Sequence, residues 1–121
     1  MVNLIRIKRG NTANLEIKCL DRNGQIITDL AFTSEVHFQV KKREKQAVAD
    51  IAKTSGAGVT VDSPDTGWVT VALDITDTDL PVALYYMALQ LEYGGVEKYE
   101  CRLLVDDKET ERLEIQQDIV L

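Results

Sequence analysis

Side chains that could catalyse a reaction or bind a metal are few in this chain, and they form no catalytic pattern. His37 is the sole histidine, so a metal site with two histidine ligands is impossible. Asp74, Asp77 and Asp79 could offer oxygens to calcium, but their spacing matches no EF-hand loop, and we favour a short turn or single helical turn capped by side-chain oxygens. The serines stand in no nucleophile-elbow motif. We therefore expect no catalytic residue, no metal ion and no cofactor, and we predict that the protein is not an enzyme.

The two cysteines are expected to be buried thiols. Two cysteines, Cys19 and Cys101, are too few for a disulfide framework, and a reducing cytoplasm would keep them as thiols. Each stands in phase with apolar neighbours along an expected strand. They therefore read as two small core side chains.

Aromatic side chains are the remaining candidates for a binding surface. Alternation along residues 68–73 turns the valines and the leucine inward, which leaves Trp68 at least partly exposed. A partly exposed tryptophan can anchor a partner, or it can lie across a sheet edge or under a loop. Tyr86 and Tyr93 are the other aromatic residues that could stack on a sugar.

Length and composition are typical of one soluble globular domain. The chain has 121 residues, of which 45% are apolar and 28% are charged. No apolar run approaches the ~18 residues that a membrane-spanning helix needs. The N-terminal MVNLIRIKRG does not resemble a secretion signal, because its basic residues follow the apolar ones. We expect a protein that folds in the cytoplasm where it is made.

Charge is distributed unevenly along the chain, whose net charge is -6. Residues 1–45 hold nine Lys/Arg against five Asp/Glu, whereas residues 46–121 hold five against fifteen. This asymmetry reflects either a solvated surface or complementary contact between copies or with a neighbour. Nucleic acid is an unexpected partner for so acidic a chain.

Apolar residues recur at every second position over several short segments, which is the pattern of half-buried antiparallel strands. In EVHFQVK, Val36, Phe38 and Val40 are expected to face the core and His37 to face outward. Residues 41–58 fit neither a helical face nor a strict strand, and we favour an extended or edge segment there. The clearest strands are predicted at residues 3–9, 13–20, 35–41, 68–73, 85–91 and 97–105.

Two turns fix the expected register of these strands. The sequence DRNG at residues 21–24 suits a tight reversal, and pairing across it sets Cys19 opposite Ile26 on the apolar face. Gly94 and Gly95 are expected to form a three-residue loop with Val96, because a two-residue loop would set apolar against charged residues. The resulting pairs would be Leu91 with Tyr99, Leu89 with Cys101, and Met87 with Leu103.

The order of strands and the polar corner before Tyr85 resemble an immunoglobulin-like antiparallel β-sandwich of about seven strands. Tyr85 follows the corner DTDLPVAL, at the position of a tyrosine whose hydroxyl bonds back to the upstream backbone. Met87 stands where antibody domains have a cysteine, so the antibody disulfide is absent.

The pattern is more specifically similar to the small immunoglobulin-like domains of tailed-bacteriophage virion proteins, as found at the N-terminus of baseplate upper proteins and in short tail or neck proteins. The resemblance rests on RGNT, LEIKCLDRNGQIITDL, EVHFQVK and the hairpin DTGWVTVALDITDTDLPVALYYMALQLEYGGVEKYECRLLV, and it covers residues 1–106. Val82, Ala83 and Leu84 precede Tyr85 where a glycine is common in that family. The resemblance implies a virion subunit or adaptor, synthesised in the bacterial cytoplasm, that contacts other virion proteins and its own copies.

The last part of the chain, residues 107–121, is expected to be either a last strand or a C-terminal arm. Its apolar residues in strand phase are Leu113, Ile115, Ile119 and Leu121. They could complete the protein's own sheet, or pair with the edge of a neighbouring subunit. A structural or assembly role is therefore the leading hypothesis, and a carbohydrate-binding or adhesion module is the alternative.

Overall fold

The computed structural model describes residues 4–43, 45–63, 65–95, 97–106 and 108–117, which form an all-β fold. One 3-10 turn, η1 (Leu30–Phe32), lies between two of the strands. No helix in the described part of the chain is long and apolar enough to cross a membrane. The strands are β1 (Leu4–Lys8), β2 (Ala13–Leu20), β3 (Thr33–Lys41), β4 (Ile51–Ser55), β5 (Gly58–Ser63), β6 (Trp68–Leu73), β7 (Ala83–Tyr93), β8 (Glu97–Val105), β9 (Lys108–Glu109) and β10 (Arg112–Gln116).

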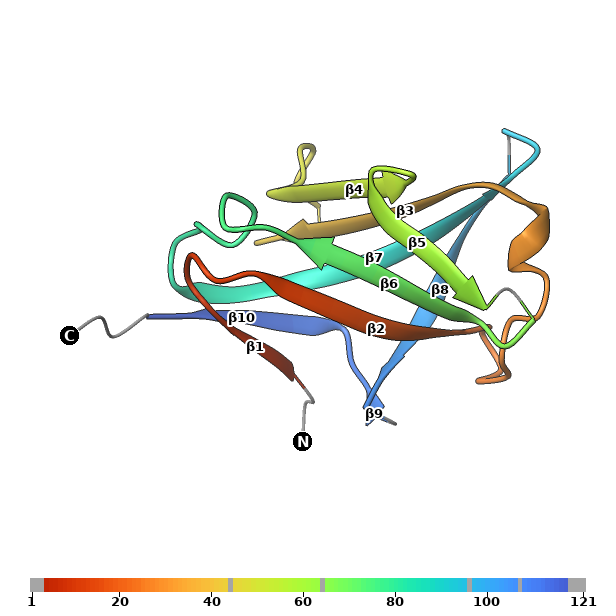
Figure 1. The fold of residues 1–121 in the computed structure, drawn as a ribbon, viewed down its shortest axis with the longest axis horizontal. Helices are drawn as coiled ribbons and strands as arrows, with labels where there is room; N and C mark the ends of the chain where they lie inside the picture. Colours follow the sequence, from red (N-terminus) through yellow and green to blue (C-terminus); the bar gives the residue numbers. More distant parts are fainter. Residues whose placement is uncertain (1–3, 44, 64, 96, 107, 118–121) are drawn as a thin grey trace.

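Seven of these strands close into a β-barrel, so the predicted immunoglobulin-like sandwich is wrong. The order around the barrel is β7-β3-β4-β5-β6-β2-β8, and β8 pairs again with β7. A sandwich would leave two sheets facing each other without hydrogen bonds between them. Here β4 pairs with β5 on one side and β8 pairs with β2 on the other, so the strands surround one interior (Figure 1).

β8 closes the barrel because it changes its partner along its length. Up to Cys101 it pairs with β7, and beyond that residue it pairs with β2, where Leu103 lies opposite Cys19. The expected pair of Met87 with Leu103 is therefore wrong. The backbone N–H of Met87 donates instead to the carbonyl of Glu111, at 2.9 Å. Alternation could not reveal this change, because a strand keeps its inward and outward faces whichever neighbour it pairs with.

The alternating apolar side chains face the barrel interior, as predicted. Val36, Phe38 and Val40 of β3 are completely buried. Both cysteines are buried free thiols, which confirms their expected role in the core. A hydrogen bond with Cys19, together with burial, raises the pKa of the Cys101 thiol.

The C-terminal part of the described chain supplies a strand of the protein's own sheet. β10 pairs antiparallel with β7 and parallel with β1, so it lies between them. Leu113 and Ile115 are completely buried in the core and are not exposed for a partner. The structure thus selects the last-strand alternative for residues 112–116. Ile119 and Leu121, the other two residues of the expected arm, lie outside the described residues.

The register after β2 differs by one residue from the expected one. Ile26 was expected on the apolar face, but it is 43% exposed, and Ile27 is buried in its place. The reason is the side chain of Asp21, whose Oδ1 accepts from the backbone N–H groups of Asn23 and Gln25 and sets the loop. The N–H of Ile27 then donates to the carbonyl of Cys19, and a one-residue shift exchanges the two faces.

The glycine turn between β7 and β8 has the predicted length. Tyr93 pairs with Glu97, which leaves a three-residue loop at 94–96, although Val96 itself lies outside the described residues. Gly94 and Gly95 have φ angles of 63° and 75°. These angles fall in the left-handed region, where a side chain is disfavoured, so the loop requires its glycines.

Candidate functional site

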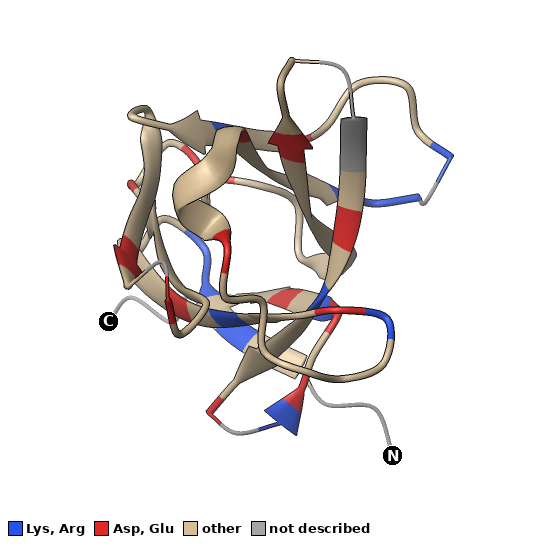
Figure 2. Ribbon diagram, turned by 90° about the vertical axis from the view of Figure 1, so that its right-hand side faces the viewer, with Lys and Arg blue, Asp and Glu red and all other residues tan. Residues whose placement is uncertain are grey.

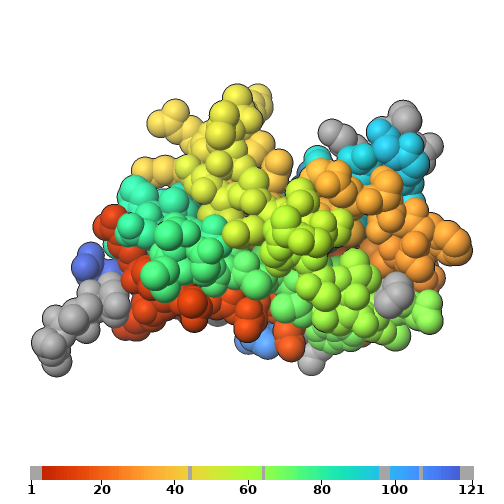
Figure 3. All heavy atoms as spheres, turned by 45° about the horizontal axis from the view of Figure 1, so that its top comes forward, coloured from red at the N-terminus to blue at the C-terminus, as the bar shows by residue number. Residues whose placement is uncertain are grey.

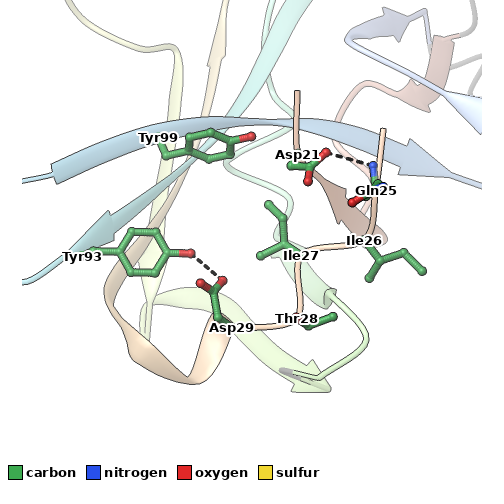
Figure 4. A pocket seen from close by; sticks show the side chains of 8 residues that line it. All are labelled: Asp21, Gln25, Ile26, Ile27, Thr28, Asp29, Tyr93 and Tyr99. Carbon is green, nitrogen blue, oxygen red and sulfur yellow. Dashed lines mark hydrogen bonds between the residues drawn. The ribbon is translucent and has the colours of Figure 1, made fainter. Parts of the chain in front are cut away.

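An open hollow at one end of the barrel is the candidate binding site, and we call it the tyrosine hollow (Figure 4). Its volume of about 820 Å³ lies within the range of ligand pockets, roughly 300–1,000 Å³. Its walls come from the loop after β2, from the end of β7 and from β8. The lining residues are Asp21, Gln25, Ile26, Ile27, Thr28, Asp29, Tyr93 and Tyr99.

Strand alternation places both tyrosines in the hollow. Tyr93 follows the buried Leu91 on β7, and Tyr99 precedes the buried Cys101 on β8, so both continue the core face of their strands. At the end of the barrel this core face opens to solvent. The two phenols are therefore half-buried, and their hydroxyls point across the hollow toward the loop after β2 (Figure 4).

Each tyrosine hydroxyl is held by a backbone or side-chain group from the opposite wall. The Tyr93 hydroxyl donates to Asp29 Oδ1 at 2.9 Å. The Tyr99 hydroxyl accepts from the backbone N–H of Arg22 at 2.8 Å. Burial, followed by the hydrogen bond and charge of Asp29, raises the pKa of Tyr93. The Tyr93 phenol is therefore neutral at physiological pH and acts as a hydrogen-bond donor.

The hollow has an acidic wall that leaves carboxylate oxygens available. Asp29 uses Oδ1 for Tyr93, and Asp21 uses Oδ1 for the loop backbone. The Oδ2 atom of each has no hydrogen bond to another described residue. Two cations lie nearby. The Arg22 guanidinium is 6.0 Å from the centre of the Tyr99 ring, and the Arg102 guanidinium donates to the carbonyl of Arg22 at 3.2 Å and interacts electrostatically with Asp21. The unbonded Oδ2 atoms of the two aspartates and the half-buried ring of Tyr93 favour a cationic or donor-rich group in the hollow.

One exposed apolar side chain lines the tyrosine hollow, and another lies in the turn that adjoins it. Ile26 is 43% exposed and forms part of the lining of the hollow. Phe32, in the adjoining turn η1, is 79% exposed, and its backbone N–H donates to the carbonyl of Asp29. A polar hollow bordered by exposed apolar side chains is suited to a partner that offers both kinds of group.

A second cluster of chemically active side chains lies on the outer face of the sheet. His37 Nε2 is 3.1 Å from Glu92 Oε2 and 3.3 Å from Glu35 Oε2. The three donor atoms lie within 4.8 Å of one another and are of the kinds that ligate metals. A histidine side chain in contact with two carboxylates satisfies the same geometry without a metal. The expected outward position of His37 is confirmed, but its two carboxylate partners were not foreseen.

The other aromatic candidates are covered by cations of the same chain. Trp68 is partly exposed, as predicted, and the Lys18 ammonium lies 5.4 Å from its ring centre. The Arg112 guanidinium lies 3.8 Å from the ring centre of Tyr86. These contacts occupy a face of each ring. Among the described residues, the structure does not bring Trp68 together with Tyr86 or with the buried Leu113 in one site.

Tyr85 has the structural role that the sequence predicted. Its ring is 2% exposed, and its hydroxyl donates to the carbonyl of Pro81 at 2.7 Å. The bond fastens the connection between β6 and β7 to the strand that follows.

Sequence reasoning missed the acidic wall of the hollow and named only Tyr93 of its two tyrosines. Tyr99 was expected on the core face, and the only signal for its exposure was its closeness to the Gly94 turn, where a barrel ends. Asp29 and Tyr93 are 64 residues apart, so their contact has no signature in local spacing.

Comparisons with family models, with curated proteins and with solved structures gave no match for this chain.

Proposed function

We propose that the protein is a non-enzymatic assembly subunit that acts through protein–protein contacts, and that the tyrosine hollow is its docking surface. One observation supports this most directly: half-buried Tyr93 and Tyr99 line a hollow together with the exposed Ile26, and the exposed Phe32 lies in the adjoining turn. Tyrosines in partly desolvated pockets are enriched among the residues that dominate binding energy at interfaces. Ile26 and Phe32 then supply apolar area that a partner would cover.

The resemblance to tailed-bacteriophage virion proteins provides a proposed setting for this assembly. In that setting many copies join a tail, neck or baseplate, and the partners are other virion proteins and further copies of this chain. A charged outer surface with a few exposed apolar side chains, two of which lie at or beside the hollow, is compatible with a subunit that meets its neighbours at defined points. Nucleic acid, membrane and small molecules have no part in the proposal.

Site-specific photo-crosslinking would test the docking surface. A photoreactive amino acid replaces the exposed Phe32 in the turn beside the hollow, and the matched control replaces the exposed Thr60 on β5. We expect one discrete crosslinked product from position 32, which mass spectrometry identifies as a structural protein or a second copy, and none from position 60. Absence of a product, or equal products from both positions, would contradict the proposal.

Carbohydrate binding is the second candidate function, favoured by two tyrosines and two free carboxylate oxygens in one hollow. Sugars offer hydroxyl donors to carboxylates and apolar ring faces to aromatic side chains. Titration with a glycan panel, followed by the intrinsic fluorescence of Trp68 and the tyrosines, separates the two functions. A saturable change that Tyr99→Ala removes would favour sugar binding, and an assembly subunit shows none.

A further inference from the structure

A loop at the other end of β3 exposes cationic side chains, which could complement the carboxylates of the tyrosine hollow. Lys42, Arg43 and Lys45 are exposed there, and none of them forms an ion pair with another described residue. Val48 in the same loop is 77% exposed. We call residues 42, 43 and 45–48 the basic loop; Glu44, between them, lies outside the described residues. The basic loop offers cations and one apolar side chain, whereas the hollow offers carboxylate oxygens, tyrosines and an exposed apolar side chain.

The basic loop is fastened at its base, so its cations stand on a defined support. Asp50 Oδ2 accepts from the backbone N–H of Lys42 at 3.0 Å and from Gln46 Nε2 at 3.1 Å. Gln46 Nε2 also donates to the carbonyl of Val48 at 2.6 Å. Figure 3 shows this loop, in yellow, standing out from the barrel surface. A pre-formed, projecting loop loses less conformational entropy on binding than a free one.

The hollow and the basic loop cannot meet within one molecule. β3 begins beside η1 at the hollow end and finishes at the basic loop, and its nine residues span about 30 Å. Lys/Arg and Asp/Glu are otherwise interspersed over the ribbon (Figure 2), so the charge asymmetry along the sequence does not make one basic and one acidic half. Complementarity is local to these two sites, and it can be satisfied only between molecules.

We propose that the basic loop of one copy docks into the tyrosine hollow of a second copy. The Arg43 guanidinium meets the free oxygen of Asp29 and the ring of Tyr93, and Val48 covers the exposed Ile26. Arginine suits this site because its planar fork binds carboxylates and stacks on aromatic rings. The inference rests on the proposed assembly function, for which it names a second copy as the partner.

Such an interface is heterologous, since it joins two different surfaces of the same chain. Every copy that docks its loop still has an empty hollow, and the copy that receives it still has a free loop. Head-to-tail contacts of this kind produce open chains, or rings where the rotation closes. The mass in solution should therefore rise with concentration without stopping at a dimer, and the association should weaken with salt because charged groups contribute.

Sedimentation velocity of the full chain would test the inference with two variants that each disable one surface. Arg43→Ala removes the cation of the loop, and Thr28→Arg places a cation in the hollow without removing the bond between Tyr93 and Asp29. We expect each variant to associate at least tenfold more weakly than the wild type. An equimolar mixture of the two should form a 1:1 dimer that grows no further, because only one functional interface remains. Lys8→Glu and Glu16→Arg, which change charge on other exposed strand positions, should associate like the wild type.

A wild-type chain that stays monomeric at all concentrations, or variants that associate like the wild type, would overturn self-docking. The crosslinking experiment at Phe32 then decides the proposed function separately. If position 32 crosslinks a different structural protein, the assembly function stands and only the identity of the partner changes. If it crosslinks nothing, both proposals fail.

Discussion

The hydroxyl of Tyr93 on β7 donates a 2.9 Å hydrogen bond to Asp29 Oδ1, which connects the two walls of the tyrosine hollow. Tyr93→Phe removes this bond and keeps the ring, so we expect the free energy of unfolding to fall by about 1 kcal/mol. Urea denaturation of the wild type and of Tyr93→Phe at pH 7 measures this difference in free energy. An unchanged midpoint would show that the bond does not hold the walls together.

The same tyrosine should make stability depend on alkaline pH. Burial and Asp29 raise the pKa of Tyr93 above its ordinary value of 10.0, so the unfolded chain loses the phenol proton first. The contribution of the Tyr93 phenol to the free energy of unfolding is complete below about pH 10 and decreases as the pH rises further. Urea midpoints between pH 8 and 11.5 should decline more steeply in the wild type than in Tyr93→Phe. Tyr85, whose pKa burial raises, and Cys101, whose pKa a hydrogen bond with Cys19 and burial raise, contribute to the slope that remains.

Asp74 should produce the opposite dependence at acid pH. Hydrogen bonds from the Thr76 hydroxyl and from the backbone N–H of Asp77 lower the pKa of Asp74 from 3.8 to about 2. The charged carboxylate therefore stabilises the turn above about pH 4, and this contribution is lost as the pH falls through 2. Asp74→Ala should lower the thermal midpoint at pH 6 and narrow its difference from the wild type at pH 2. A constant difference at both pH values would exclude the capping role.

Variants of the C-terminal strand β10 would show whether it belongs to the core or is a dispensable arm. Leu113 is completely buried, and Leu113→Ala should cost about 2–5 kcal/mol because it leaves a cavity beside β7. Removal of residues 107–121 should unfold the barrel, whereas removal of residues 118–121 alone should leave the thermal midpoint near that of the wild type. Circular dichroism of the two truncations checks this. A folded protein without residues 107–121 would mean that β10 is dispensable.

Local patterning predicted the parts of the fold that depend on neighbours in sequence. Alternation placed Val36, Phe38 and Val40 inward, and register arithmetic gave the loop after Tyr93 its length. Barrel closure was missed because it depends on β8 leaving β7 after Cys101, a choice between two partners that present similar apolar faces.

The hollow was missed for a related reason, since its walls join residues that are far apart in the chain. Side-chain hydrogen bonds also decided which of two neighbouring residues faces the core. Asp21 sets the loop in which Ile26 is exposed and Ile27 is buried. Alternation contains no information about such a bond. The sequence could therefore supply the strands and their inward faces, whereas the barrel closure and the site had to come from the three-dimensional arrangement.

The outer-face cluster provides a last prediction, in which His37 compensates a repulsion built into the register. Glu35 lies directly opposite Glu92 on the neighbouring strand, and like charges so placed destabilise a sheet. His37 Nε2 contacts both carboxylates, so His37→Gln should lower the free energy of unfolding by about 0.5–1 kcal/mol. Adding Glu35→Gln to that variant removes the repulsion and should restore most of the loss. Urea midpoints of the single and double variants measure the coupling, and additive losses would show that the three side chains act independently.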